Sequence, residues 1–340
     1  MTKEKRFLKV TDLMEEKKSP LSLPVVLVAI ALLCCALWGS ATPAIKWGYI
    51  LLNIDTENVA SIMLFAGIRF ALAGLFTVII FSIARGRLLY PRLKNMPKVL
   101  TVSVFQTIIQ YIFFYLGLAY TTGVKGTVTS GSGAFFAVII ACLIFKQEKF
   151  SAKKIIACII GFIGIVIINF DGLMITEKEN EILGVIFVLI STVSNAFSSV
   201  LIKKFSRDED PVVISGYQFM VGGVVMIAVG LIAGGEISFA DLNGVLVLIY
   251  LALLSAVAYS LWGLLLKYNP VSRVTVFNFT TPIFGTFLTM IFVPWENTEI
   301  APWNLAITLI LVSAGIFLLN FNLEEMIKKY KARKIGNSKT

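Results

Sequence analysis

The sequence predicts an all-α integral membrane protein with ten transmembrane helices arranged as two inverted five-helix repeats. Hydrophobic residues make up 57% of the 340 residues and charged residues only 15%, whereas a typical soluble domain carries about 25% charge. Apolar runs near the length that crosses a bilayer as a helix recur along the chain. The basic residues gather in every second connection between these runs. The net charge of +10 therefore indicates membrane topology rather than nucleic-acid binding.

The apolar runs divide the chain into two halves of five spans each. The first run follows a basic segment, but it is too long for the hydrophobic region of a signal peptide. The predicted spans are 24–51, 58–84, 98–120, 122–146, 151–170, 182–204, 211–233, 243–267, 270–294 and 301–322. The domains are a tail at 1–23, a first repeat at 24–170, an extracytoplasmic linker at 171–181, a second repeat at 182–322 and a basic tail at 323–340.

Charge sorting supports the count of ten and predicts the orientation. The two tails and every second connection hold 26 of the 30 Lys and Arg residues. The opposite connections hold only Lys125 and Lys178, together with ten acidic residues. By the positive-inside rule both termini are cytoplasmic, and one miscounted span would break this alternation. We expect a multi-pass protein of the cell membrane, meaning the inner or plasma membrane.

The ends of the two halves share a short motif. Residues 164–170 read GIVIINF and residues 315–321 read GIFLLNF, so that Gly, Ile, Asn and Phe recur at an offset of 151. Five spans per half force two related halves into opposite orientations. Inverted repeats are typical of secondary transporters, whose substrate site lies near the midplane between the repeats.

Two cations, Lys46 and Arg69, lie inside apolar runs, and no Asp or Glu lies within a predicted span. An intramembrane cation costs about 2.5–3.5 kcal/mol on insertion scales. Arg69 lies about 16 Å from the outer end of its span, too deep to reach the interface. Lys46 lies near the outer end of the first span, where it can extend to the headgroups. Each cation either bonds to backbone carbonyls or binds an anionic group of a substrate, a task that suits the planar guanidinium.

Other polar and aromatic residues within the spans are candidate cavity residues. Gln106 and Gln110 share a helical face in the third span, and Asn278 lies in the ninth. Contacts between helices explain such residues as readily as substrate binding does. We take the three amides as hydrogen-bonding candidates. Aromatic walls are expected from Trp38, Tyr217 and Trp262, with Tyr259 a weaker candidate.

Helix-breaking residues recur in corresponding positions of the two halves. Pro282 in the ninth span corresponds to Gly131 in the fourth, where Gly133 follows closely. Pro removes a helix hydrogen bond and Gly lowers the resistance to bending. Pro43 adds a breaker in the first span. These residues are either gate or hinge positions or plain structural kinks.

Several classes of chemistry lack the residues they need. The chain has no His, and its four Cys residues lie in apolar runs without metal-ligand spacing. Without His or intramembrane carboxylates, the usual side chains of a proton relay are missing. We expect no catalytic residue, no metal and no cofactor, and therefore not an enzyme.

Short motifs in the first half resemble those of a known family. They are Trp38-Gly-Ser40 followed by Pro43-Ala-Ile-Lys46, Ile68-Arg69-Phe70 with Ala73-Gly74, Gly117-Leu-Ala-Tyr120 and Lys146-Gln-Glu148. With them the chain resembles the drug/metabolite transporter (DMT) superfamily, specifically EamA-type transporters, from about residue 25 to 322. The resemblance implies ten spans in two inverted repeats and the movement of small metabolites, often outward. Many members have Pro in the fourth span where this chain has Gly131.

Together these observations predict a secondary transporter that works by alternating access. It is expected to move a small metabolite, such as an amino acid or a related amphiphile, across the cell membrane in the export direction. A channel or a transport-inactive membrane sensor is the alternative. The expected partners are the substrate and the lipid bilayer, with no nucleic acid, and the chain is expected to be a monomer or a homodimer.

Overall fold

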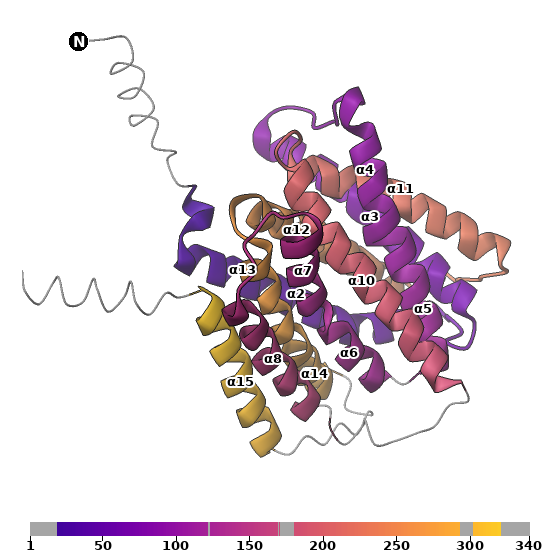
Figure 1. Ribbon diagram of the computed structural model, residues 1–340. Coiled ribbons are helices and arrows are strands. Elements are labelled where there is room, and N and C mark those ends of the chain that lie inside the picture. Colours follow the sequence, from indigo (N-terminus) through magenta and orange to yellow (C-terminus); the bar gives the residue numbers. More distant parts are fainter. Residues whose placement is uncertain (1–18, 122, 169, 171–179, 293–301, 321–340) are drawn as a thin grey trace, which may run out of the picture.

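The computed structural model describes residues 19–121, 123–168, 170, 180–292 and 302–320, and these residues contain helices but no strand. Figure 1 shows the helices gathered into one bundle. The elements are η1 (Pro20–Ser22), α2 (Pro24–Leu51), α3 (Val59–Arg85), η2 (Leu93–Asn95), α4 (Met96–Ser103), η3 (Val104–Ile109), α5 (Gln110–Tyr120), α6 (Gly123–Gly131), α7 (Gly133–Ile139), η4 (Ile140–Ile144), α8 (Ala152–Ile168), α10 (Glu181–Phe205), α11 (Pro211–Ile232), α12 (Leu242–Tyr268), α13 (Val271–Thr275), η5 (Val276–Thr280), α14 (Thr281–Phe292) and α15 (Pro302–Asn320).

The helices confirm the predicted all-α membrane class. Nine helical stretches within the described ranges are long and apolar enough to cross a bilayer. They correspond to every predicted span except the fifth, where α8 has 17 residues and is not among them. The tails up to residue 18 and from residue 321, together with most of the predicted linker, lie outside the described residues. The count of ten spans and the cytoplasmic placement of the termini stay predictions.

Helix packing has the same pattern in both halves. Helix α2 of the first half packs against α12 and α14, and its counterpart α10 of the second half packs against α5 and α7. Two further pairs join counterparts directly, α3 with α11 and α8 with α15. Helix α3 also packs against α12, and its counterpart α11 packs against α4 and η3 of the third span. Exchanging the halves therefore maps these packed pairs onto one another. This is the pattern expected of two repeats related by a pseudo-twofold axis.

The pair α3 and α11 is held together backbone to backbone by glycines. A Cβ at Gly74 would lie 2.4 Å from the carbonyl oxygen of Gly216, and one at Gly223 would lie 2.3 Å from the backbone nitrogen of Ala71. Small residues at such seams let membrane helices approach closely and gain van der Waals contact. A side chain at Gly74 or Gly223 would force α3 and α11 apart.

The connections gather at two opposite ends of the bundle. The basic end, as we call it, carries the segments 85–98, 146–154, 203–210 and 267–273. There Ser272 at the start of α13 contacts Glu148, and Arg273 donates to the carbonyl oxygen of Leu319 at 3.3 Å. At the opposite end the Ser238 amide donates to the Leu52 carbonyl at 3.0 Å. The segments that share the basic end are those that charge sorting assigns to one side of the membrane.

Candidate functional site

Arg69 occupies the middle of α3 and is buried. Asn58 caps the start of this helix, and Gly86 ends it in the left-handed conformation. The side chain is 4% exposed. Its Nε and Nη2 donate to the Ser255 hydroxyl oxygen at 3.2 and 3.0 Å, and its guanidinium lies 5.1 Å from the ring centre of Phe70. The cation is thus held by a neutral hydroxyl and an aromatic face.

The guanidinium of Arg69 keeps unused hydrogen-bonding capacity. A guanidinium has five N–H groups, and the contacts with described residues engage only its Nε and Nη2. Ser255 gives its own proton to the Leu251 carbonyl at 2.8 Å and therefore accepts from Arg69. No carboxylate of the described residues forms an ion pair with Arg69. Because buried cations are normally paired, this arrangement suits an anionic ligand.

Four tyrosines lie within electrostatic range of Arg69. They are Tyr49 of α2, Tyr111 and Tyr115 of α5, and Tyr259 of α12. The hydroxyls of Tyr111 and Tyr259 form a hydrogen bond of 2.7 Å, which links the third helix of the first repeat to the third of the second. The tyrosines give the cation a polar but uncharged surrounding.

No strong pattern in the sequence singled out four of these surrounding residues, Tyr49, Tyr111, Tyr115 and Ser255. Tyr111 and Tyr115 are four residues apart and share a helical face, as Gln106 and Gln110 do. That spacing was a usable signal. It was weak, because aromatic residues within membrane spans more often serve packing or anchoring.

Two of the predicted aromatic walls come together, and the third does not. The ring of Trp38 lies 4.9 Å from that of Trp262 and 5.0 Å from that of Tyr259, in edge-on contacts. The indole N–H of Trp38 is buried without a partner among the described residues. Tyr217 lies elsewhere, because its hydroxyl donates to the carbonyl of Leu89 at the basic end, at 3.2 Å. The joined rings connect α2 with α12 beside the tyrosine group.

The predicted amides lie on irregular helical segments. Gln106 falls within η3, a π-helical turn, and Gln110 begins α5. Both are buried, and their side-chain oxygens have no partner among the described residues. Asn278 is half buried in the 3-10 helix η5. Because π-helical turns recur at functional sites and buried acceptors need a donor, Gln106 and Gln110 favour a ligand with N–H groups.

Lys46 stands apart from Arg69 in its surroundings. It is half buried on α2, two helical turns beyond Trp38. The adjacent Trp47 donates its indole N–H to the Phe292 carbonyl at 3.0 Å, at the end of α14. The position of Lys46 agrees with the shallow depth inferred from the sequence.

The helix-breaking residues divide into two kinds. The fourth span is interrupted between Gly131, the end of α6, and Gly133, the start of α7. The ninth span changes from 3-10 to α-helix just before Pro282, so the interruptions fall at corresponding positions. Helix α2, in contrast, runs without a break through Pro43. Gly39, one turn before Pro43, packs so tightly that a Cβ there would lie 2.5 Å from Phe284 Cβ.

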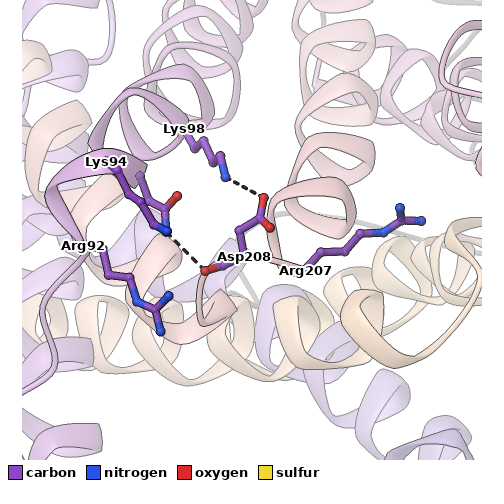
Figure 2. Close-up of a pocket in the computed structure, with 6 residues that line it drawn as sticks. Arg92, Lys94, Lys98, Arg207 and Asp208 are labelled. Atoms are coloured by element: carbon purple, nitrogen blue, oxygen red, sulfur yellow. Dashed lines mark hydrogen bonds and ion pairs between the residues drawn. The ribbon is translucent and has the colours of Figure 1, made fainter.

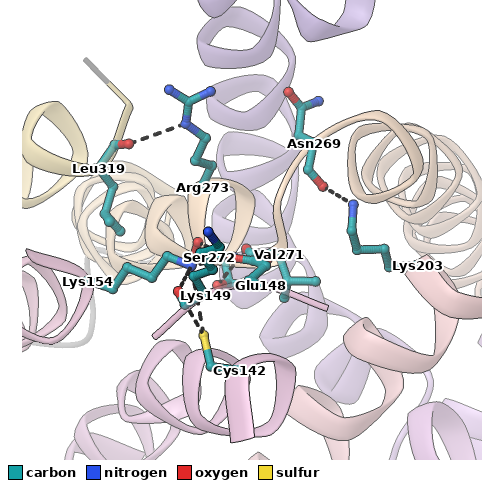
Figure 3. A network of polar contacts seen from close by, with 11 residues as sticks. Cys142, Glu148, Lys149, Lys154, Lys203, Asn269, Val271, Ser272, Arg273 and Leu319 are labelled. Atoms are coloured by element: carbon teal, nitrogen blue, oxygen red, sulfur yellow. Dashed lines mark hydrogen bonds and ion pairs between the residues drawn. The ribbon is translucent and has the colours of Figure 1, made fainter. Parts of the chain in front are cut away.

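A partly buried polar network closes the basic end (Figure 3). Glu148 accepts hydrogen bonds from the Lys154 ammonium at 2.7 Å and from the backbone amide and hydroxyl of Ser272. Burial raises the pKa of the Glu148 carboxyl, but the hydrogen bonds from Lys154 and Ser272 outweigh burial and hold the pKa below its usual range. Glu148 belongs to the first half and Ser272 to the second, so the network joins the halves.

The four cysteines form neither a disulfide nor part of a metal-ligand cluster within the described residues. All four are buried free thiols. The described part of the chain contains no group of three His, Cys, Asp or Glu side chains that could hold a metal ion.

Comparison with known proteins agrees with this architecture. The chain is 27% identical over 254 residues to an uncharacterized transporter of Archaeoglobus fulgidus, covering 72% of this chain and 82% of the relative. It is 21% identical over 294 residues to a chloroplastic WAT1-related protein of Arabidopsis thaliana, covering 84% and 67%. One solved crystal structure superimposes with a TM-score of 0.69 at 16% identity, covering 86% of this chain and 96% of that one, and shows the same fold.

The family assignment rests on both halves. The sequence profile of the EamA-like transporter family matches residues 25–170 and again residues 182–321. The two matches cover most of the chain, and each corresponds to one of its two halves. This chain is a multi-pass protein of the plasma membrane, and it belongs to the EamA-like transporter family.

Proposed function

We propose that the protein is a secondary transporter that exports a small metabolite bearing an anionic group, such as an amino acid or a related amphiphile. The observation that carries the proposal is Arg69, a buried cation whose only hydrogen-bond partner among the described residues is the hydroxyl of Ser255. A carboxylate can accept two parallel N–H bonds from one guanidinium. Substrate binding would therefore supply the missing counter-charge.

The surroundings of Arg69 support a substrate that also has donors and an apolar body. The side-chain oxygens of Gln106 and Gln110 are unpartnered acceptors that an ammonium or amine could satisfy. Trp38 and Trp262 provide ring surface, and aromatic faces attract both apolar groups and cations. Asn278, in the ninth span, and Lys46, near the outer end of the first span, are further candidate contacts of the substrate.

The paired interruptions support alternating access. Gly131 with Gly133, and Pro282 in the other half, lie at corresponding interruptions of the fourth and ninth spans, where the two repeats would hinge. In the proposed orientation both termini are cytoplasmic and ten spans form two inverted repeats. The Glu148 network then closes the cytoplasmic end of the conformation described here.

A counterflow experiment tests the proposal. The purified protein would first be screened by thermal shift against amino acids and their uncharged amides, because a bound ligand raises apparent stability. The acid that stabilises the protein is then loaded into proteoliposomes, and uptake of its labelled form is measured. We expect accumulation of label with the wild type and with Arg87→Gln, an exposed control cation, but not with Arg69→Gln.

Four outcomes would contradict the proposal. Equal stabilisation by acids and by their amides would show that the protein does not recognise an anionic group on its substrate. Counterflow with Arg69→Gln at the wild-type rate, in a variant that folds normally, would remove Arg69 from the site. Flux that does not saturate with substrate would indicate a channel, and absence of flux with ligand binding retained would indicate a sensor.

A further inference from the structure

A basic hollow lies at the basic end of the bundle, away from Arg69. Its volume is about 460 Å³ and it opens to the surface. Segment 92–98 of the first half and segment 207–208 of the second half form its walls (Figure 2). The lining residues are Arg92, Lys94, Asn95, Lys98, Arg207 and Asp208, so four of six are cations.

The acidic residues at this hollow hold the two segments together. Asp208 accepts from the Lys98 ammonium at 2.6 Å, which keeps the pKa of the Asp208 carboxyl below its usual range, and its backbone carbonyl accepts from the Asn95 amide at 3.2 Å. Glu209 accepts from the same amide at 2.9 Å and from the Arg92 backbone N–H at 3.0 Å. Asn95, 1% exposed, is the buried centre of this junction. The carboxylates thus have structural partners already.

Three cations of the hollow are left for a ligand. The side chains of Arg92, Lys94 and Arg207 are exposed and form no hydrogen bond or ion pair within the described part of the chain. Figure 2 shows Arg92 and Arg207 extending on opposite sides of Asp208. Exposed guanidinium and ammonium groups gathered around one hollow suit a phosphate group.

Large apolar side chains project from the same connection. Leu88 is 70% exposed, Tyr90 is 67% exposed and Leu93 is 87% exposed. Leu93 lies between two cations of the hollow, Arg92 and Lys94. Apolar groups alternating with cations at the end of a membrane bundle match a surface whose headgroups are anionic and whose interior is hydrocarbon.

We propose that this hollow binds the headgroup of an anionic phospholipid while Leu88, Tyr90 and Leu93 insert among the acyl chains. The basic residues would bind the phosphate, and the apolar residues distinguish a lipid from a soluble phosphate. The assignment to the cytoplasmic leaflet rests on the proposed orientation, but headgroup binding does not. Because segment 92–98 of the first half and segment 207–208 of the second half form the hollow, a bound lipid would bridge the two repeats.

The test compares two double variants that lose the same charge at the same end. Arg92→Gln with Lys94→Gln removes two cations of the hollow, and Arg87→Gln with Lys267→Gln removes two exposed cations that do not line it. Native mass spectrometry and thermal shift in detergent would measure binding of dioleoyl-phosphatidylglycerol, dioleoyl-phosphatidylcholine and glycerol 3-phosphate.

We expect the wild type and the control double variant to prefer phosphatidylglycerol over phosphatidylcholine. The hollow variant should bind phosphatidylglycerol roughly 30-fold more weakly, since each basic residue near an anionic surface contributes about 1 kcal/mol and 1.4 kcal/mol is tenfold. Leu93→Ser, which keeps every charge, should weaken phosphatidylglycerol several-fold and leave glycerol 3-phosphate unchanged.

Other outcomes would overturn the proposal. Equal losses in the two double variants would mean that lipid binding follows net charge and not this hollow. Stabilisation by glycerol 3-phosphate equal to that by phosphatidylglycerol would make the site one for a soluble anion. A wild type without preference between the two lipids would exclude headgroup recognition. None of these readouts uses transport, so failure here leaves the Arg69 proposal untouched.

Discussion

Arg69 is buried and Lys154 is partly buried, but the two cations differ more in their partners than in their exposure. At the basic end, Lys154 contacts the Glu148 carboxylate at 2.7 Å and the carbonyl oxygen of Lys149 at 2.9 Å. Inside the bundle, Arg69 contacts the hydroxyl of Ser255 and a ring face. A cation with a structural role receives negative partners from its own chain. Arg69 does not, and this difference separates the candidate binding site from the network that closes one end.

Replacing Arg69 is the strongest test of this difference. Arg69→Gln should lower counterflow more than 100-fold, because it removes the charge that the substrate would pair with. Arg69→Lys should retain part of the activity, because a lysine keeps the charge but not the bidentate fork. The thermal stability of both variants should stay at or above that of the wild type. A large loss of stability would instead assign Arg69 a structural role like that of Lys154.

Replacing Glu148 should lower the stability of the protein, whereas replacing Arg69 should lower transport. Glu148→Gln leaves the partly buried ammonium of Lys154 with a weaker partner, and the loss should be smaller than the roughly 3–5 kcal/mol of breaking a fully buried pair. We expect a clear fall in apparent melting temperature, measured by fluorescence during heating in detergent. Lys149→Gln, an exposed neighbour, is the control. Equal stability of Glu148→Gln and wild type would show that the network does not hold the halves together.

The same network predicts a dependence of stability on pH. The folded-state pKa of Glu148 lies below its usual range, so its stabilising contribution is complete above the unfolded pKa of about 4.3. It should be lost as the pH falls through the lower, folded-state pKa. The melting temperature of the wild type should therefore fall toward that of Glu148→Gln in strongly acidic buffer. Parallel curves for the two proteins at all pH values would contradict this prediction.

Ser255→Ala should have a smaller effect than the changes at Arg69 and Glu148. A bound carboxylate would still hold Arg69, so we expect substrate affinity to change by no more than about tenfold, the scale of one hydrogen bond to a charged group. Concentration-dependent counterflow measures this change. A complete loss of transport would mean that positioning of Arg69 by α12, rather than its charge, limits the site.

The sequence predicted the deep position of Arg69 and the interruptions at Gly131 and Pro282, because hydropathy and helix-breaking chemistry are local properties. It did not predict the tyrosine group, because which aromatic residues face Arg69 depends on how α2, α5 and α12 pack. It also did not predict the contact between Glu148 and Ser272, because the two residues are 124 positions apart and meet only through tertiary packing.

The glycine seam between α3 and α11 has a mechanical consequence. Where Gly74 meets Gly216, and Gly223 meets Ala71, no interlocking side chains separate the two backbones. The two helices cannot separate without losing most of their contact. We expect the α3–α11 contact to stay intact during the transport cycle, as the axis about which the two halves rotate, while helices farther from it move more. A covalent link between α3 and α11 should then be compatible with transport, whereas a link between α2 and α10 should block it.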